Sequence, residues 1–314
     1  MKVVEQTVRL RSEAFGNRPT AGVSGEVLRR LQPAVKDSVL MTLRGQSAGP
    51  GRPPTWLSSA SDIRFIGVSR DQDAVFHFEV STLGESAAIL YDQNEIWPNR
   101  PDPGLTSLDL LAGVIREVRS GNEESDGFDS HLLQRVSAFK RTLSEGVDEI
   151  IVEDREGRSL PEAIVSKATV ETAETLRFEI PPPRQVRVAG MLDMIRVSTQ
   201  TLALRLDDGN EVKGVFLSDD VQPLAGFLNR RVVVLGKAIY RPSGRVLRID
   251  VDSFELGEGV QSFWSRVPRA LDQRELPKEL RQQAYSKCGV AAFFGTWPGD
   301  ETDEELLAAL HNMS

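Results

Sequence analysis

The sequence has few of the residues that form disulfide bonds or bind metal ions. Its 314 residues include one cysteine, Cys288, and three histidines, His77, His131 and His311. A single cysteine excludes an intramolecular disulfide and a cysteine-rich zinc site. The lack of disulfides is typical of proteins from a reducing compartment. The histidines are far apart in the sequence and show no metal-ligand spacing. We therefore expect no cofactor and no bound metal.

Sequence motifs of catalysis are also missing. The chain has no phosphate-binding Walker loop, no GxGxxG and no HExxH, and the segment 22–25 is one residue too short for a nucleophile elbow. We interpret His77 as a surface or hydrogen-bonded core residue and Cys288 as a small apolar core residue. An enzyme with an unrecognised site in the first 180 residues remains an alternative, because spacing alone does not reveal a pocket.

Long apolar segments are absent as well. No run approaches the roughly eighteen apolar residues of a membrane span, and residues 1–6 lack the apolar core of a signal peptide. With 40% hydrophobic and 27% charged residues, the composition is that of a soluble globular protein, and we expect it in the cytoplasm with no membrane partner. The formal charge of −8 argues against a protein that mainly coats nucleic acid.

The patterns that are present predict an α+β protein with three parts. Residues 1–180 read as a mixed α+β domain of no recognised family, 181–183 as a stiff proline linker, 184–258 as a five-stranded barrel and 259–314 as a helical, acidic extension. In the first part, strands are expected at 2–11, 62–69, 74–81, 149–153 and around 178–180. Helices are expected at 26–44, 83–93, from 106, at 129–143 and at 159–174.

The second part has the clearest pattern. Alternating apolar residues predict strands at 186–192, 201–206, 211–217, 231–241 and 245–254, with a short helix from Ser218 to Phe227 between the third and the fourth. This β-β-β-α-β-β order resembles the OB fold, a small barrel that often binds oligonucleotides, oligosaccharides or proteins. The resemblance implies an architecture and leaves the ligand open.

A basic hairpin in this barrel suggests one function. From Arg230 to Arg248 there are six basic residues and no acidic one. If Tyr240 shares an outer face with Arg248, a ring beside guanidinium groups could stack the bases of a single strand. The candidate nucleic-acid surface is Arg231, Lys237, Tyr240, Arg241, Arg245 and Arg248. Alternatively, the small residues Gly236 and Ala238 face outward for packing, and the arginines pair with the acidic surface of the first domain.

The carboxy-terminal extension suggests another function. After Trp297 and a Pro298-Gly299 turn, Thr302 and Glu305 form a capping box for an acidic helix with a leucine edge. A helix of about ten residues is marginal alone in water and needs a surface to pack on. That surface could belong to a partner or to the same chain.

The stretch 295–305 resembles the acidic ends of bacterial antitoxins encoded beside toxin nucleases. Such antitoxins are short and carry a small DNA-binding module in place of the two larger domains expected here. The resemblance implies a non-enzymatic regulatory protein whose tail binds a partner protein, such as a toxin ribonuclease. The implied contact residues are Trp297, Asp300, Glu301, Asp303, Glu304, Glu305, Leu306, Leu307 and Leu310.

Overall fold

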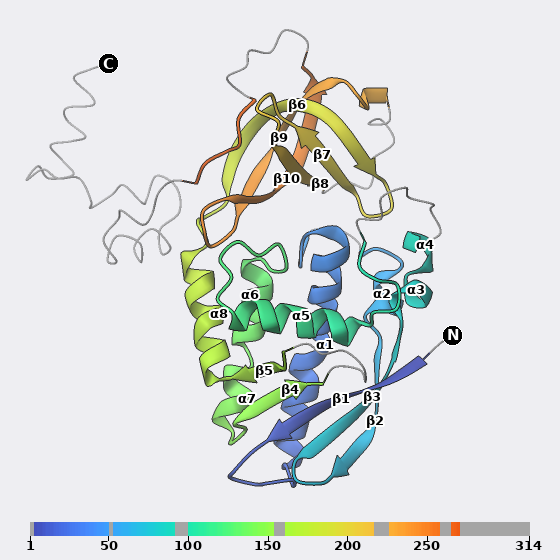
Figure 1. Cartoon of the computed structure of the whole chain (residues 1–314), viewed down its shortest axis with the longest axis vertical. Helices are drawn as coiled ribbons and strands as arrows, with labels where there is room; N and C mark the ends of the chain where they lie inside the picture. Colours follow the sequence, from blue (N-terminus) through green and yellow to red (C-terminus); the bar gives the residue numbers. More distant parts are fainter. Residues whose placement is uncertain are drawn as a thin grey trace, which may run out of the picture. The chain divides into compact units, whose positions relative to one another are not determined.

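The computed structural model describes residues 3–49, 53–91, 100–153, 161–216, 226–257 and 265–270. These residues form an open five-stranded sheet with helices, which we call the sheet domain, followed by a closed five-stranded barrel (Figure 1). The expected α+β class is confirmed. The expected carboxy-terminal helix and every contact residue placed on it lie outside the described residues.

The sheet of the first part is antiparallel throughout, in the order β2-β3-β1-β4-β5. Its strands are β1 (Val3–Arg11), β2 (Ile63–Arg70), β3 (Ala74–Ser81), β4 (Glu149–Val152) and β5 (Ala163–Ser166). Alternate residues such as Val8, Leu10, Phe76 and Phe78 are buried in the main core. The period-2 patterns at 2–11, 62–69, 74–81 and 149–153 therefore predicted real strands.

The helices are α1 (Ala21–Arg44), α2 (Leu57–Ala60), α3 (Leu83–Ser86), α4 (Ala88–Tyr91), α5 (Ser107–Arg119), α6 (Ser130–Ser137), α7 (Lys140–Ser144) and α8 (Lys167–Glu179). α1 contributes Val27, Leu31 and Val35 to the core that the sheet shares with α5. It begins earlier than expected, because the Thr20 side chain caps it by accepting a hydrogen bond from the Val23 amide. Pro33 lies inside this helix.

Two expectations near the end of the sheet domain are wrong. The helix expected at 159–174 is replaced by strand β5 and by helix α8, which the Ser166 side chain caps at its start. The strand expected around Phe178 is the last turn of the same helix. The apolar run Ala163–Val165 is short, and a run of that length fits a buried strand as well as a helix. Pairing with β4 decides for the strand.

The barrel consists of β6 (Arg184–Arg196), β7 (Thr201–Arg205), β8 (Glu211–Phe216), β9 (Arg231–Tyr240) and β10 (Val246–Leu256). Its order is β10-β8-β7-β6-β9, and pairing of β9 with β10 closes it. Among these pairs β8–β10 is parallel and the others are antiparallel. The five predicted strands are confirmed, whereas the helix expected before β9 falls mostly outside the described residues.

The inner face of β9 differs from the expectation. Val232 and Val234 belong to the apolar interior of the barrel, so the alternate residues Gly236 and Ala238 follow them on the inward side. The expectation that these small residues face outward is wrong. A Cβ atom on Gly236 would lie 2.2 Å from the carbonyl oxygen of Asp250, so glycine is needed where β9 approaches β10. The alternation of residues along a strand defines its two faces, but it does not show which face lies inside the barrel.

Candidate functional site

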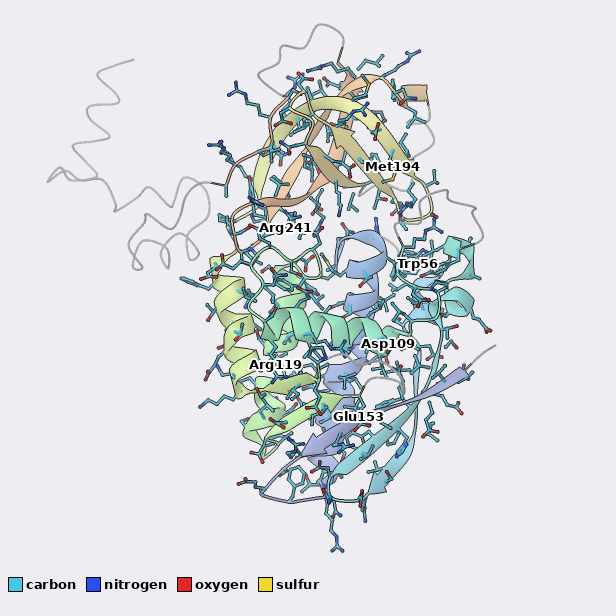
Figure 2. All side chains as sticks on the ribbon, in the orientation of Figure 1. Trp56, Asp109, Arg119, Glu153, Met194 and Arg241 are labelled. Carbon is cyan, nitrogen blue, oxygen red and sulfur yellow. The ribbon has the colours of Figure 1, made fainter. Side chains whose placement is uncertain are left out.

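The basic hairpin formed by β9 and β10 faces an acidic segment, residues 123–129, between α5 and α6. Arg241, labelled in Figure 2, lies at the end of the hairpin that meets this segment. The ion pairs are Arg241–Asp126, Arg245–Glu124, Arg248–Asp129 and Lys213–Asp126, with nitrogen–oxygen distances of 2.9, 3.6, 3.2 and 3.0 Å. The hairpin arginines therefore pair with the sheet domain, which is the alternative that the sequence had left open.

The Arg248–Asp129 pair is the buried centre of this junction. Each side chain is 6% exposed, and Arg248 also donates to Asp250 at 2.7 Å. Asp129 accepts a hydrogen bond from the backbone amide of Ser47. Burial alone would raise the pKa of the Asp129 carboxyl, but Arg248 and the hydrogen bonds from Ser47 and Leu132 hold that pKa below its ordinary value. The carboxylate is therefore ionised inside the junction.

Apolar side chains complete the junction. Leu247 and Ile239 of the barrel pack in one cluster with Met41, Phe128 and Val136 of the sheet domain. The Arg44 side chain of α1 also donates a hydrogen bond to the carbonyl oxygen of Phe216 on β8, at 2.9 Å. The hairpin is thus attached by a mixed apolar and ionic surface. Its arginines carry their counter-charges within the chain.

The remaining members of the predicted nucleic-acid surface lie in three different settings. Tyr240 is 1% exposed, so its ring is not a surface platform, and burial raises the pKa of its hydroxyl. Arg231 forms two hydrogen bonds with the Asp207 carboxylate, at 2.7 and 2.8 Å. Lys237 is exposed and lies opposite Gln185 of β6 in the strand register.

A second basic surface, which the sequence reasoning missed, lies on the barrel. It is a groove of about 1050 Å³ between the start of β6, the β7–β8 turn and the segment 265–269. We call it the arginine groove, and its lining residues are Arg184, Gln185, Val186, Arg187, Asp207, Asp208, Asn210, Ser265, Arg266, Val267, Pro268 and Arg269. Arginines at 184, 187, 266 and 269 could have drawn attention in the sequence, but they lie in segments about eighty residues apart.

Local hydrogen bonds hold the walls of this groove. In the β7–β8 turn the Asp208 carboxylate accepts from the Asn210 amide at 2.9 Å, and Gly209 adopts a positive φ of 82° that glycine tolerates best. The Asp207 amide donates to the Ser265 hydroxyl at 2.9 Å. Tyr240 donates to the carbonyl oxygen of Arg269 at 3.4 Å. The segment 265–269 is therefore anchored at both ends, by Ser265 and by Arg269.

The charge of the groove is positive. Arg187 lies 3.5 Å from Glu255, whereas Arg184, Arg266 and Arg269 have no carboxylate partner within the described ranges. The hydrogen bonds from Arg231 hold the pKa of Asp207 below its usual value, so that carboxylate is ionised and its charge is matched by a guanidinium outside the lining. Hydrogen bonds from Asn210 hold the pKa of Asp208 below its usual value, so this carboxylate adds one negative charge to the lining. The three guanidinium groups outweigh it and can meet an anionic ligand.

The exposed face of the sheet carries a chain of three polar residues. His77 on β3 contacts Glu5 through Nδ1 at 2.7 Å and Ser69 through Nε2 at 2.6 Å. These contacts follow the order of a serine-hydrolase triad. The Glu5 side chain, however, is 63% exposed, and none of the three residues lines the arginine groove. A hydrated cross-strand ladder explains the arrangement as it stands.

Two further features were sought in the part of the chain that the structure describes. Within it, no helix combines the length and hydrophobicity needed to cross a membrane, and no group of three histidine, cysteine, aspartate or glutamate residues is arranged to hold a metal ion. No family model, curated protein or solved structure matches the chain.

Proposed function

We propose that this protein is a non-catalytic binding protein whose barrel is of the OB kind and holds single-stranded nucleic acid in the arginine groove. The five strands, their closure and the β-β-β-α-β-β order expected from the sequence support the OB-like assignment. One observation favours nucleic acid as the ligand. Three guanidinium groups without carboxylate partners in the described chain line one groove of a protein with a formal charge of −8.

Phosphate contacts suit this groove better than base stacking. Arginine presents a planar fork of donors that matches phosphate oxygens, and such contacts fix a nucleic-acid backbone without reading its sequence. Among the residues that the structure describes, no aromatic side chain lines the groove. We therefore expect binding that tolerates many sequences, depends strongly on salt and shows little contribution from stacking.

The test is fluorescence anisotropy of a labelled single-stranded 20-mer at several salt concentrations. The variant Arg184→Gln, Arg266→Gln, Arg269→Gln should lose most of the affinity. Its plot of log affinity against log salt should be shallower by about 2, because each phosphate contact on a single strand contributes roughly 0.7 to the slope.

The matched control removes the same charge elsewhere. Arg64, Arg70 and Arg177 are exposed residues of the sheet domain, and changing all three to Gln should leave the affinity close to that of the parent chain. Equal losses in the two triple variants would show a general charge effect and would contradict a site in the groove. Circular dichroism should show that both variants are folded.

A second proposal concerns the carboxy-terminal tail. The acidic stretch 295–305 and the leucines that follow it support an antitoxin-like role, in which the tail binds a partner protein such as a toxin nuclease. The contact residues would be those from Trp297 to Leu310 named above. A pull-down from the host with the full chain beside a chain ending at residue 292 tests this role. A protein captured only by the full chain supports the proposal, and identical captured proteins contradict it.

A further inference from the structure

A second pocket lies away from the arginine groove, between α1, α6 and the residues that follow α1. Its volume is about 230 Å³, and the residues that matter here are Lys36, Asp37, Gln46, His131 and Arg135. This volume suits a ligand much smaller than a nucleic acid, and neither the groove nor the hairpin contributes to the pocket.

The rim of the pocket is organised around a buried carboxylate. The Asp37 side chain is 8% exposed and contacts His131 Nε2 at 3.0 Å and Arg135 Nε at 2.6 Å. Arg135 uses only its Nε atom in this pair, so its two terminal amino groups have no protein partner within the described residues. Lys36 lines the same pocket and is exposed. Asp37 thus positions a cationic rim that has donors left for an anion.

The inner wall contains an acceptor without a partner. Gln46 is 1% exposed, and its side-chain oxygen makes no hydrogen bond within the described chain. Burying an acceptor in this way costs free energy that a donor from a ligand would recover. Gly49 leaves room for the amide, because a Cβ atom there would lie 2.1 Å from Gln46 Nε2. The pocket lining therefore combines anion-binding donors with a buried acceptor that no described residue satisfies.

We propose that this pocket binds a small organic anion that carries a hydroxyl group, such as a hydroxy acid or a short hydroxylated phosphate ester. The carboxylate or phosphate meets Arg135 and Lys36, and the hydroxyl donates to Gln46. Neighbouring contacts connect the pocket with the domain junction. Ser47, also in the lining, donates its amide to Asp129, and Arg44 donates to Phe216 of the barrel.

Isothermal titration calorimetry of the full chain tests this site. The probes are L-malate, L-glycerate and glycerol 3-phosphate. Succinate, which is malate without its hydroxyl group, serves as the comparison. At least one hydroxylated probe should bind, and if malate does, it should bind at least tenfold more tightly than succinate. Failure of all three hydroxylated probes, or equal binding of malate and succinate, would overturn the proposal.

Two variants separate a binding role from a structural one. Gln46→Met keeps the side-chain size but removes the acceptor, so it should abolish the preference for a hydroxylated probe over its analogue without the hydroxyl. Arg135→Gln should weaken every anionic probe by tenfold or more. The control Arg29→Gln, at an exposed position of α1, should leave all affinities unchanged. Retained preference in Gln46→Met would contradict the assigned contact even if the protein binds the probe.

Discussion

At the scale of single residues, the Arg248–Asp129 pair shows why a basic residue in the sequence need not be a ligand contact. A buried ion pair is favourable only when its geometry and its hydrogen bonds compensate for lost hydration, and removing one partner leaves an uncompensated charge. Here the backbone amides of Ser47 and Leu132 also donate hydrogen bonds to the Asp129 carboxylate. Arg248 therefore stabilises the junction and is not available to a phosphate.

We expect Asp129→Asn to lower the free energy of unfolding by about 3 kcal/mol, because Arg248 would lose a buried partner. Urea unfolding followed by circular dichroism measures this change. Asp62→Asn is the matched control. It breaks the exposed Asp62–Arg64 pair, for which less than about 1 kcal/mol is expected. Equal effects of the two changes would contradict the role given to the junction.

The same pair predicts a dependence on pH. The pKa of Asp129 in the folded chain lies below its ordinary value of 3.8, so ionised Asp129 stabilises the folded state at pH values above that number. This contribution is lost as the pH falls from about 4 through the folded pKa. The gap in stability between the parent and Asp129→Asn should therefore shrink below pH 4 and stay constant between pH 5 and 7.

At the scale of elements, period-2 patterns predicted four strands of the sheet and all five of the barrel. The pattern failed where an apolar run was short, at Ala163–Val165, and it could not state which face of β9 is inside. The need for glycine at position 236 comes from the close approach of Asp250 on the neighbouring strand. A contact between two strands cannot be read from the sequence of one of them. The outer face that the nucleic-acid hypothesis required for Tyr240 is excluded, because this ring is buried.

Gly236→Ala tests the closure of the barrel. The added methyl group must displace the β10 backbone, and overpacking of this kind typically costs 1–3 kcal/mol. We expect a loss of stability in that range by thermal or urea unfolding. Gly113→Ala on α5 is the control, because its Cβ would meet no atom within 4 Å and alanine favours a helix. A Gly236→Ala variant as stable as the parent would refute the close approach.

At the scale of the whole molecule, charge is distributed in two different ways. The acidic segment 123–129 neutralises the hairpin arginines, whereas the arginine groove keeps three guanidinium groups without carboxylate partners in the described chain. The sequence showed the basic hairpin because its residues are contiguous. It could not show the groove, whose walls come from 184–187, 207–210 and 265–269. Composition and net charge say nothing about such an assembly of distant segments.

The position at which a single strand contacts the protein tests binding in the arginine groove most directly. A photoreactive oligonucleotide can be cross-linked to the full chain, and the attached peptides identified by mass spectrometry. We predict cross-links in 184–187, 207–210 and 265–269, which disappear when Arg184, Arg266 and Arg269 are all changed to Gln. Cross-links confined to the hairpin at 241–245, or to the sheet domain, would contradict it.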